Sequence, residues 1–159
     1  MTFNTLLDSL QQSAPAVAIA ESAWIYPGLE TLHVIAIGLV YGSIVMVDLR
    51  LMGLAWRDRG VAEWIRTLLP WTWTAFACAL LTGSALFSSK AATFAYNLPF
   101  QLKFAAIALA GVNMLVFHAL VQPRLDAQGR APGARLAGAL SIALWTGVVC
   151  AGRWIGFTI

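Results

Sequence analysis

Four long apolar runs separated by polar segments constrain the fold of this chain more than any other feature. They extend from about Ala23 to Val47, Leu68 to Phe87, Phe100 to Val121 and Leu136 to Ile155. A helix rises ~1.5 Å per residue and a bilayer core is ~30 Å thick, so each run is long enough to cross it. The sequence therefore predicts an all-α integral membrane four-helix bundle, with residues 1–159 forming a single transmembrane domain.

The composition agrees with a lipid environment. Hydrophobic residues make up 60% of the chain and charged residues 11%, whereas about a quarter of the residues in soluble domains are charged. The lipid bilayer is therefore the expected partner. The net charge of +3 does not indicate a nucleic-acid partner, because most of the arginines fall in two short connectors. Residues 1–4 carry no charged side chain, so no cleaved signal is expected before the first span.

The distribution of basic residues predicts the orientation. Cytoplasmic connectors are enriched in Lys and Arg, and most of the ten basic residues lie in the first and third connectors: Arg50, Arg57, Arg59, Arg66, Arg124, Arg130 and Arg135. We expect a bacterial inner-membrane protein with both termini on the periplasmic side. The helical spacing of Phe3, Leu6, Leu7 and Leu10 predicts a short amphipathic N-terminal helix on that surface. Pro70 is expected in the first turn of the second span.

Polar side chains inside the spans identify a candidate site, because each costs several kcal/mol in hydrocarbon unless it is paired. Fifteen residues separate His33 from Asp48 in the first span, and fifteen separate Lys103 from His118 in the third. These two spans run in the same direction. The spacing therefore predicts two polar layers ~22 Å apart, with His33 and Lys103 in the outer one and Asp48 and His118 in the inner one.

The outer layer is the predicted cofactor site. It contains Glu30, His33, Lys103 and Arg153. Histidine is a frequent axial ligand of heme, and four-helix bundles house such cofactors. We expect a b-type heme with His33 on the iron, and Lys103 either as sixth ligand or, with Arg153, as a partner of the propionates. The alternative is a buried structural histidine hydrogen-bonded to Glu30.

The inner layer, with Asp48, Arg50 and His118, favours a structural ion-pair cluster, and a ligand role for His118 is the alternative. One heme held by both His33 and His118 is not expected, because their levels differ. A zinc or copper site made of both histidines and both cysteines fails for the same reason, since metal ligands must share one level. Cys78 and Cys150 lie in apolar runs and are expected to be small, buried, inert side chains rather than a disulfide.

The chain resembles a family of uncharacterised bacterial four-helix inner-membrane proteins. The resemblance covers nearly the whole chain and is carried by these segments: Glu30-Thr31-Leu32-His33, Asp48-Leu49-Arg50-Leu51-Met52-Gly53, Leu69-Pro70-Trp71-Thr72-Trp73, Thr82-Gly83, Lys103 with Asn113, and Ala151-Gly152-Arg153-Trp154-Ile155. More remotely, the chain is similar to the heme-binding membrane protoporphyrinogen oxidases and to the copper-resistance D proteins. The oxidase resemblance implies heme b at His33 and a functional Lys103. Only these ligand positions carry over, because the first span exits through Asp-Leu-Arg-Leu rather than an aromatic-rich segment ending in histidine.

These observations predict a small cytochrome-like membrane protein that transfers electrons to or from a redox protein or a quinone. Its size suits a subunit or adaptor better than a complete enzyme, and a homo-oligomer is one expected form. The sequence contains no motif of soluble catalysis. Two other hypotheses are kept. One is a cofactor-free proton or small-solute transport component that uses the two polar layers. The other is a structural membrane subunit whose polar residues serve packing alone.

Overall fold

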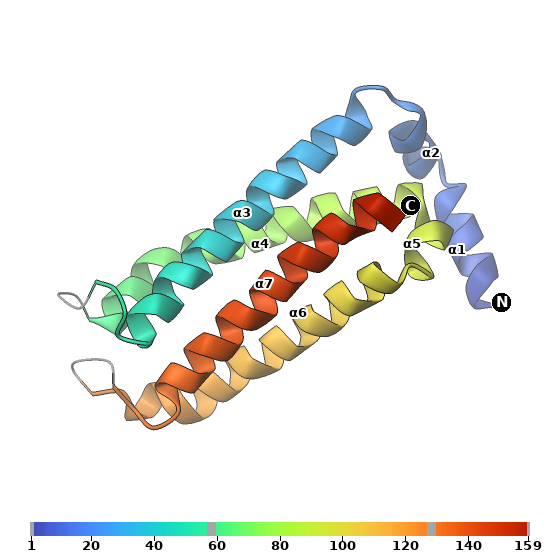
Figure 1. Ribbon diagram of the computed structural model, residues 1–159. Coiled ribbons are helices and arrows are strands. Elements are labelled where there is room, and N and C mark those ends of the chain that lie inside the picture. The colour runs from blue at the N-terminus through green and yellow to red at the C-terminus, as the bar shows by residue number, and fades with distance from the viewer. Residues whose placement is uncertain (1, 57–59, 127–129, 159) are drawn as a thin grey trace.

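The computed structural model describes residues 2–56, 60–126 and 130–158, and within these ranges the chain forms helices and no strand. Two short helices come first, α1 (Phe3–Gln11) and α2 (Ala14–Glu21). The four long helices are α3 (Ile25–Leu51), α4 (Val61–Ser89), α6 (Leu98–Val116) and α7 (Ala134–Thr158). A short helix, α5 (Ala91–Ala95), connects α4 to α6 (Figure 1).

The helix that starts with α6 continues beyond Val116. It passes through a π-helical turn, η1 (Phe117–Val121), and a 3₁₀ turn, η2 (Gln122–Arg124). Three helical segments are long and apolar enough to cross a membrane: Ile25–Leu51, Leu98–Arg124 and Ala134–Thr158. Large apolar side chains on them point outward, and Leu39 and Leu115 are both more than 60% exposed. The chain is therefore an all-helical membrane protein whose outer surface suits lipid.

Helix α4 is not among these three apolar segments. It is 29 residues long, which is enough to cross a bilayer. However, the segment from Pro70 to Thr74 alternates tryptophan with threonine after the proline and so lowers the hydropathy of its first half. Along its length α4 packs against α3.

The expected position of Pro70 is wrong. Helix α4 begins at Val61, seven residues before the apolar run, so Pro70 lies inside the helix. A helix turn in a polar connector needs no hydrophobic run, so the hydropathy pattern alone misses it. The other spans also extend beyond the predicted limits: α3 ends at Leu51 rather than near residue 47, and α7 ends at Thr158 rather than near residue 155.

The long helices form two antiparallel hairpins. Helix α3 packs against α4, α6 packs against α7, and the two hairpins meet along α3 and α7. At this contact a Cβ atom added to Gly138 would lie 3.2 Å from the carbonyl oxygen of Asp48. A glycine thus permits the backbones of α3 and α7 to approach closely, as is common between membrane helices. Helices α4 and α6 are not a packed pair in the described part of the chain.

Figure 1 shows both termini at one end of the bundle and the two arginine-bearing connectors at the other. Helices α1 and α2 cover the first end. Helix α1 buries Leu7 and lies against α5, where the Gln11 side chain accepts a hydrogen bond from the Ala92 N–H and Tyr96 donates to Asn4. The amphipathic N-terminal helix is therefore present and packs partly on protein. Arg57 and Arg59, used above to predict orientation, lie outside the described residues.

Candidate functional site

The imidazole of His33 in α3 is hydrogen-bonded to α4, where Thr82 and the backbone of Ala79 lie beside it. Its Nδ1 atom lies 2.9 Å from Oγ1 of Thr82. The Thr82 hydroxyl donates its own proton to the carbonyl of Cys78, 2.7 Å away, so it can only accept from the imidazole. Nδ1 therefore carries the proton and Nε2 carries the lone pair. In this tautomer Nε2 is the ring nitrogen that can ligate a metal ion.

A glycine lies directly against this imidazole. A Cβ added to Gly83 would lie 2.8 Å from Cε1 of His33, closer than real Cβ atoms approach other atoms. Gly83 follows Thr82 in α4, so one residue orients the ring and the next makes room for it. The Thr82-Gly83 pair thus forms the wall of α4 against which His33 rests.

Lys103 reaches the same level from α6. Its charge acts on His33, and a Cβ added to Gly152 of α7 would lie 3.7 Å from its Nζ atom. The side chain is half-buried, and none of the hydrogen bonds resolved in the described segments involves its ammonium group. Each of the two polar side chains therefore faces a glycine of the adjacent helix in its hairpin, and all four long helices contribute to one level.

The structure does not bring Glu30 and Arg153 into this group. Glu30 is exposed, and its charge acts on Tyr26, one turn earlier in α3. Arg153 is exposed, and its guanidinium lies 4.7 Å from the ring centroid of Phe157. In the structural alternative, Glu30 was expected to be the hydrogen-bond partner of His33. The structure has Thr82 in that place. Cys78 and Cys150 are free thiols, but the expected burial is wrong: Cys78 is partly buried and Cys150 is exposed, because its position on α7 faces outward.

An aromatic cluster lies beside Lys103 at the end of the bundle that carries both termini, called the outer end after the predicted orientation (Figure 1). Phe100 and Phe104 flank the lysine in sequence, and their ring centroids lie 4.8 Å apart. Phe87 of α4 stacks on Phe100 of α6 at 5.4 Å, and Phe94 of α5 lies 5.6 Å from Phe100. These rings join α4 to α6 at the outer end, although the two helices do not pack along their length.

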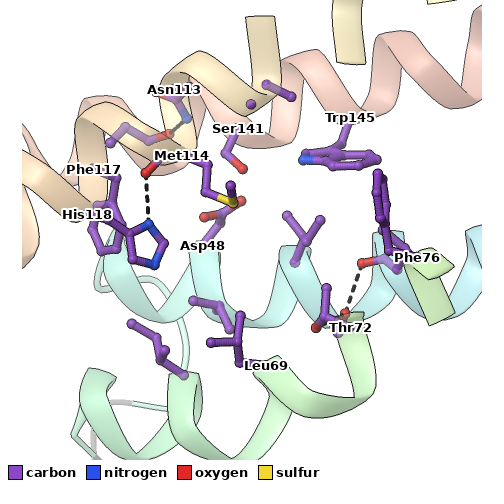
Figure 2. Close-up of a pocket in the computed structure, with 18 of the residues that line it drawn as sticks. Asp48, Leu69, Thr72, Phe76, Asn113, Met114, Phe117, His118, Ser141 and Trp145 are labelled. Carbon is purple, nitrogen blue, oxygen red and sulfur yellow. Dashed lines mark hydrogen bonds between the residues drawn. The ribbon is translucent and has the colours of Figure 1, made fainter. Parts of the chain in front are cut away.

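The inner layer surrounds a cavity of about 230 Å³ between the two hairpins. Figure 2 shows Asp48, Ser141 and Met114 near its centre, with Trp145 and Phe76 toward one end and His118 toward the other. Asp48 is 7% exposed. Ser141 lies beside its carboxyl group (Figure 2), and the Oδ2 atom is buried without a hydrogen-bond partner among the described residues. The rest of the wall is mostly apolar.

His118 lies in the π-helical turn η1 and also lines this cavity. Its Nδ1 atom donates to the carbonyl oxygen of Met114 at 2.8 Å, because a carbonyl can only accept. Nε2 therefore carries the lone pair, and Figure 2 shows the ring extending from the α6 side toward α3 and α4. The neighbouring Asn113 is engaged elsewhere: its Nδ2 atom donates to the carbonyl of Ala137 in α7 at 3.0 Å.

Two parts of this arrangement were not predicted from the sequence. One is Thr82 as the partner of His33, and the other is the inner cavity with Ser141 against Asp48. Thr82-Gly83 was noticed only as part of a resemblance; its signal is a small polar pair inside an apolar run. Within the described ranges, no three His, Cys, Asp or Glu side chains are grouped closely enough to hold a metal ion.

The comparison with known protein families shows which family the chain belongs to. A family of unknown function, DUF6644, matches residues 22–158. The chain belongs to this family. The DUF6644 match includes α3 to α7 and therefore both polar layers, and it agrees with the resemblance to an uncharacterised family. No curated protein and no solved structure matches the chain.

Proposed function

We propose that this DUF6644 protein is a small membrane cytochrome, which binds one b-type heme through His33 and passes electrons to or from a partner. The observation that carries the proposal is the placement of His33 and Lys103 at one level, each facing a glycine of the adjacent helix. Two nitrogen donors on opposite hairpins are suited to bind the two faces of a planar cofactor.

The donor set fits a heme. Thr82 holds the His33 proton on Nδ1, so Nε2 is available to an iron atom. Lys103 is suited to the sixth position. Arg153 lies outside this group, over Phe157, and stays only the predicted partner of a propionate. When bound, the group supplies reversible one-electron transfer, while the helices exclude water from it. Thr82 keeps the imidazole oriented, as the hydrogen-bond partners of ligating histidines do elsewhere.

The proposed setting is the bacterial inner membrane, with α4 as the fourth span and both termini on the periplasmic side. The common location of the termini at one end, and of the arginine connectors at the other, supports this orientation. The electron partner is a redox protein or a quinone. A chain of this size acts as a subunit or adaptor, and assembly into a homo-oligomer belongs to the same proposal.

The direct experiment is a reduced-minus-oxidised visible spectrum of protein purified in detergent from heme-sufficient cells. A Soret band with b-type α and β bands is expected, at one heme per chain. His33→Ala is expected to abolish the spectrum. His118→Ala removes a histidine at the other level and is the matched control, which is expected to retain it. Lys103→Met tests the sixth ligand and is expected to alter the spectrum rather than remove the heme.

Two results would overturn the proposal. One is the absence of a Soret band in protein that is folded and fully reconstituted with hemin. The other is an unchanged spectrum in His33→Ala together with its loss in His118→Ala, which would place the ligand in the inner layer.

The alternative function, a proton or small-solute path, receives less support. Such a path needs polar groups that continue between the layers. Between His33 and Asp48, the buried positions of α3 are Ala36 and Val40, each 3% exposed and apolar. The apolar stretch covers residues 34–40, and the next polar side chains along α3 are Tyr41, bonded to Thr146, and Ser43, which accepts from Thr72.

A further inference from the structure

We propose that the inner cavity is a second binding site, which takes a single hydroxylated aromatic ring of the quinol class. The inference deepens the proposed function by naming a site for its electron partner, and it rests on that function for its biological meaning. The binding itself depends only on the cavity, on the unpartnered Oδ2 of Asp48 and on Nε2 of His118.

The size of the cavity selects one ring. A buried apolar cavity of ~150 Å³ is sufficient to hold benzene, and this cavity measures about 230 Å³. A six-membered ring with several small substituents therefore fits, whereas the four linked pyrrole rings of a heme do not. The inner site and the proposed heme site at His33 are thus different in capacity as well as in level.

The walls suit an aromatic occupant. Trp73, Phe76, Phe117 and Trp145 line the cavity, so rings from α4, η1 and α7 surround its volume. Aromatic pairs gain free energy from offset or edge-to-face contacts beyond that of area burial alone. A flat ring would make such contacts on more than one side, whereas an aliphatic chain would not.

The polar end of the cavity specifies hydrogen-bond donors on the ligand. Asp48 presents the buried Oδ2 atom, which has no partner among the described residues. His118 presents the lone pair of Nε2, because its proton is on Nδ1. The carboxyl group of Asp48 can accept when ionised and donate when protonated, whereas Nε2 of His118 accepts. A buried polar atom without a partner is costly. A ligand with hydroxyl groups would satisfy both residues, whereas a quinone, with carbonyl groups only, has no donor for His118.

The route to this site runs through the membrane. Residues of α4 and α6 line opposite walls of the cavity, yet these helices are not a packed pair in the described part of the chain. They are joined by Phe87 and Phe100 only near the outer end. A lipophilic molecule would therefore pass from the bilayer to Asp48 between the inner halves of α4 and α6.

The test is anaerobic calorimetric titration of the purified full chain in detergent with 2,3,5-trimethylhydroquinone, after subtraction of its partition into protein-free micelles. Saturable binding to one site is expected. The oxidised form, trimethylbenzoquinone, is expected to bind at least tenfold more weakly, because it has no hydroxyl groups. Asp48→Asn is expected to weaken hydroquinone binding by tenfold or more. The matched control is Asp8→Asn in the exposed part of α1, which is expected to bind normally.

A second pair of variants tests the cavity without altering its polar groups. Gly111 lines the cavity, and a Cβ added there meets nothing within 4 Å. Gly111→Leu is therefore expected to fill the cavity and abolish binding without unfolding the protein. Gly147→Leu on α7 has equal open space and does not line the cavity, so it is expected to bind normally.

The inference is overturned if trimethylhydroquinone does not saturate, if Gly111→Leu binds as well as Gly147→Leu, or if quinone and hydroquinone bind equally. Its failure is distinguishable from that of the heme proposal, because the titration uses His33→Ala protein as well as wild type. Hydroquinone binding in heme-free His33→Ala is expected, and a heme spectrum without hydroquinone binding would reject the inner site alone.

Discussion

The Nδ1 atom of His33 and the Oγ1 atom of Thr82 lie 2.9 Å apart and connect α3 to α4 at the level of Lys103. Because the hydroxyl proton of Thr82 is donated to Cys78, the direction of this bond is fixed. Thr82 is thus a positioning residue, which acts on a bound group only through the histidine. This relationship, the close contacts of Gly83 and Gly138, and the buried carboxyl group of Asp48 give four predictions.

Thr82→Val is expected to lower the affinity of the protein for hemin by about 10–100-fold, the usual cost of removing the hydrogen-bond partner of a ligating histidine. Valine keeps the shape of threonine but cannot accept from Nδ1. Thr74→Val is the matched control, because Thr74 is an exposed residue of the same helix that bonds only to the carbonyl of Pro70. Titration of apoprotein with hemin at the Soret band measures both. Equal affinities would contradict the role of Thr82.

Gly83→Ala is expected to destabilise the protein by about 1–3 kcal/mol, the range for overpacking of a close contact. The new methyl group would lie 2.8 Å from Cε1 of His33 and displace the ring from Thr82. Gly38→Ala, in α3, places a methyl group where nothing lies within 4 Å and is expected to be neutral or slightly stabilising. Denaturant unfolding in detergent compares them. A similar free energy of unfolding in both variants would disprove the close packing.

Gly138→Ala is expected to weaken the contact between the two hairpins by a similar amount, about 1–3 kcal/mol. The methyl group would lie 3.2 Å from the backbone oxygen of Asp48 and 3.1 Å from Cγ of Met52, and the backbone cannot move without shifting α3. Gly147→Ala on the same helix faces open space and serves as the control. Thermal unfolding followed by circular dichroism measures the difference. An unchanged midpoint in Gly138→Ala would contradict the observed approach of α3 and α7.

Asp48→Leu is expected to raise the free energy of unfolding of the ligand-free protein by about 1–3 kcal/mol, because a buried acceptor without a partner carries a cost of that size. Ser141 can then bond to a backbone carbonyl of its own helix. Thr31→Leu, at an exposed position of α3, controls for the gain in hydrophobicity and is expected to have little effect. A loss of stability in Asp48→Leu, measured by denaturant unfolding, would mean that the carboxyl group supports the fold.

Much of the fold follows from the sequence, because the need to match bilayer thickness imposes long apolar helices. The fifteen-residue spacings also place His33 with Lys103 and Asp48 with His118, since the rise of a helix is constant. What could not be predicted depends on helix rotation and on partners distant in sequence. Glu30 lies one turn from His33, yet it is exposed beside Tyr26 at the outer end. Ser141, 93 positions after Asp48, reaches it only through the close approach at Gly138.

The helix ends show a second limit. Hydropathy marks where a helix enters hydrocarbon and not where it begins, so the start of α4 at Val61 and the interior position of Pro70 were missed. The π-helical turn around His118 has no signal in the apolar pattern either. Such turns widen a helix by one residue and are frequent at functional sites, and this one turns the imidazole toward the inner cavity.

The contact between α3 and α7 has a consequence for how the protein is made. These helices join the two hairpins, and α3 precedes α7 by more than eighty residues of synthesis. The face of α3 that contacts α7 is therefore unpaired until α7 has been made. During that interval Asp48 lacks its neighbour Ser141. Assembly is thus a late, cooperative closure, and a nascent chain stopped before Gly138 would present its carboxylate to the surrounding membrane and to any protease that surveys it.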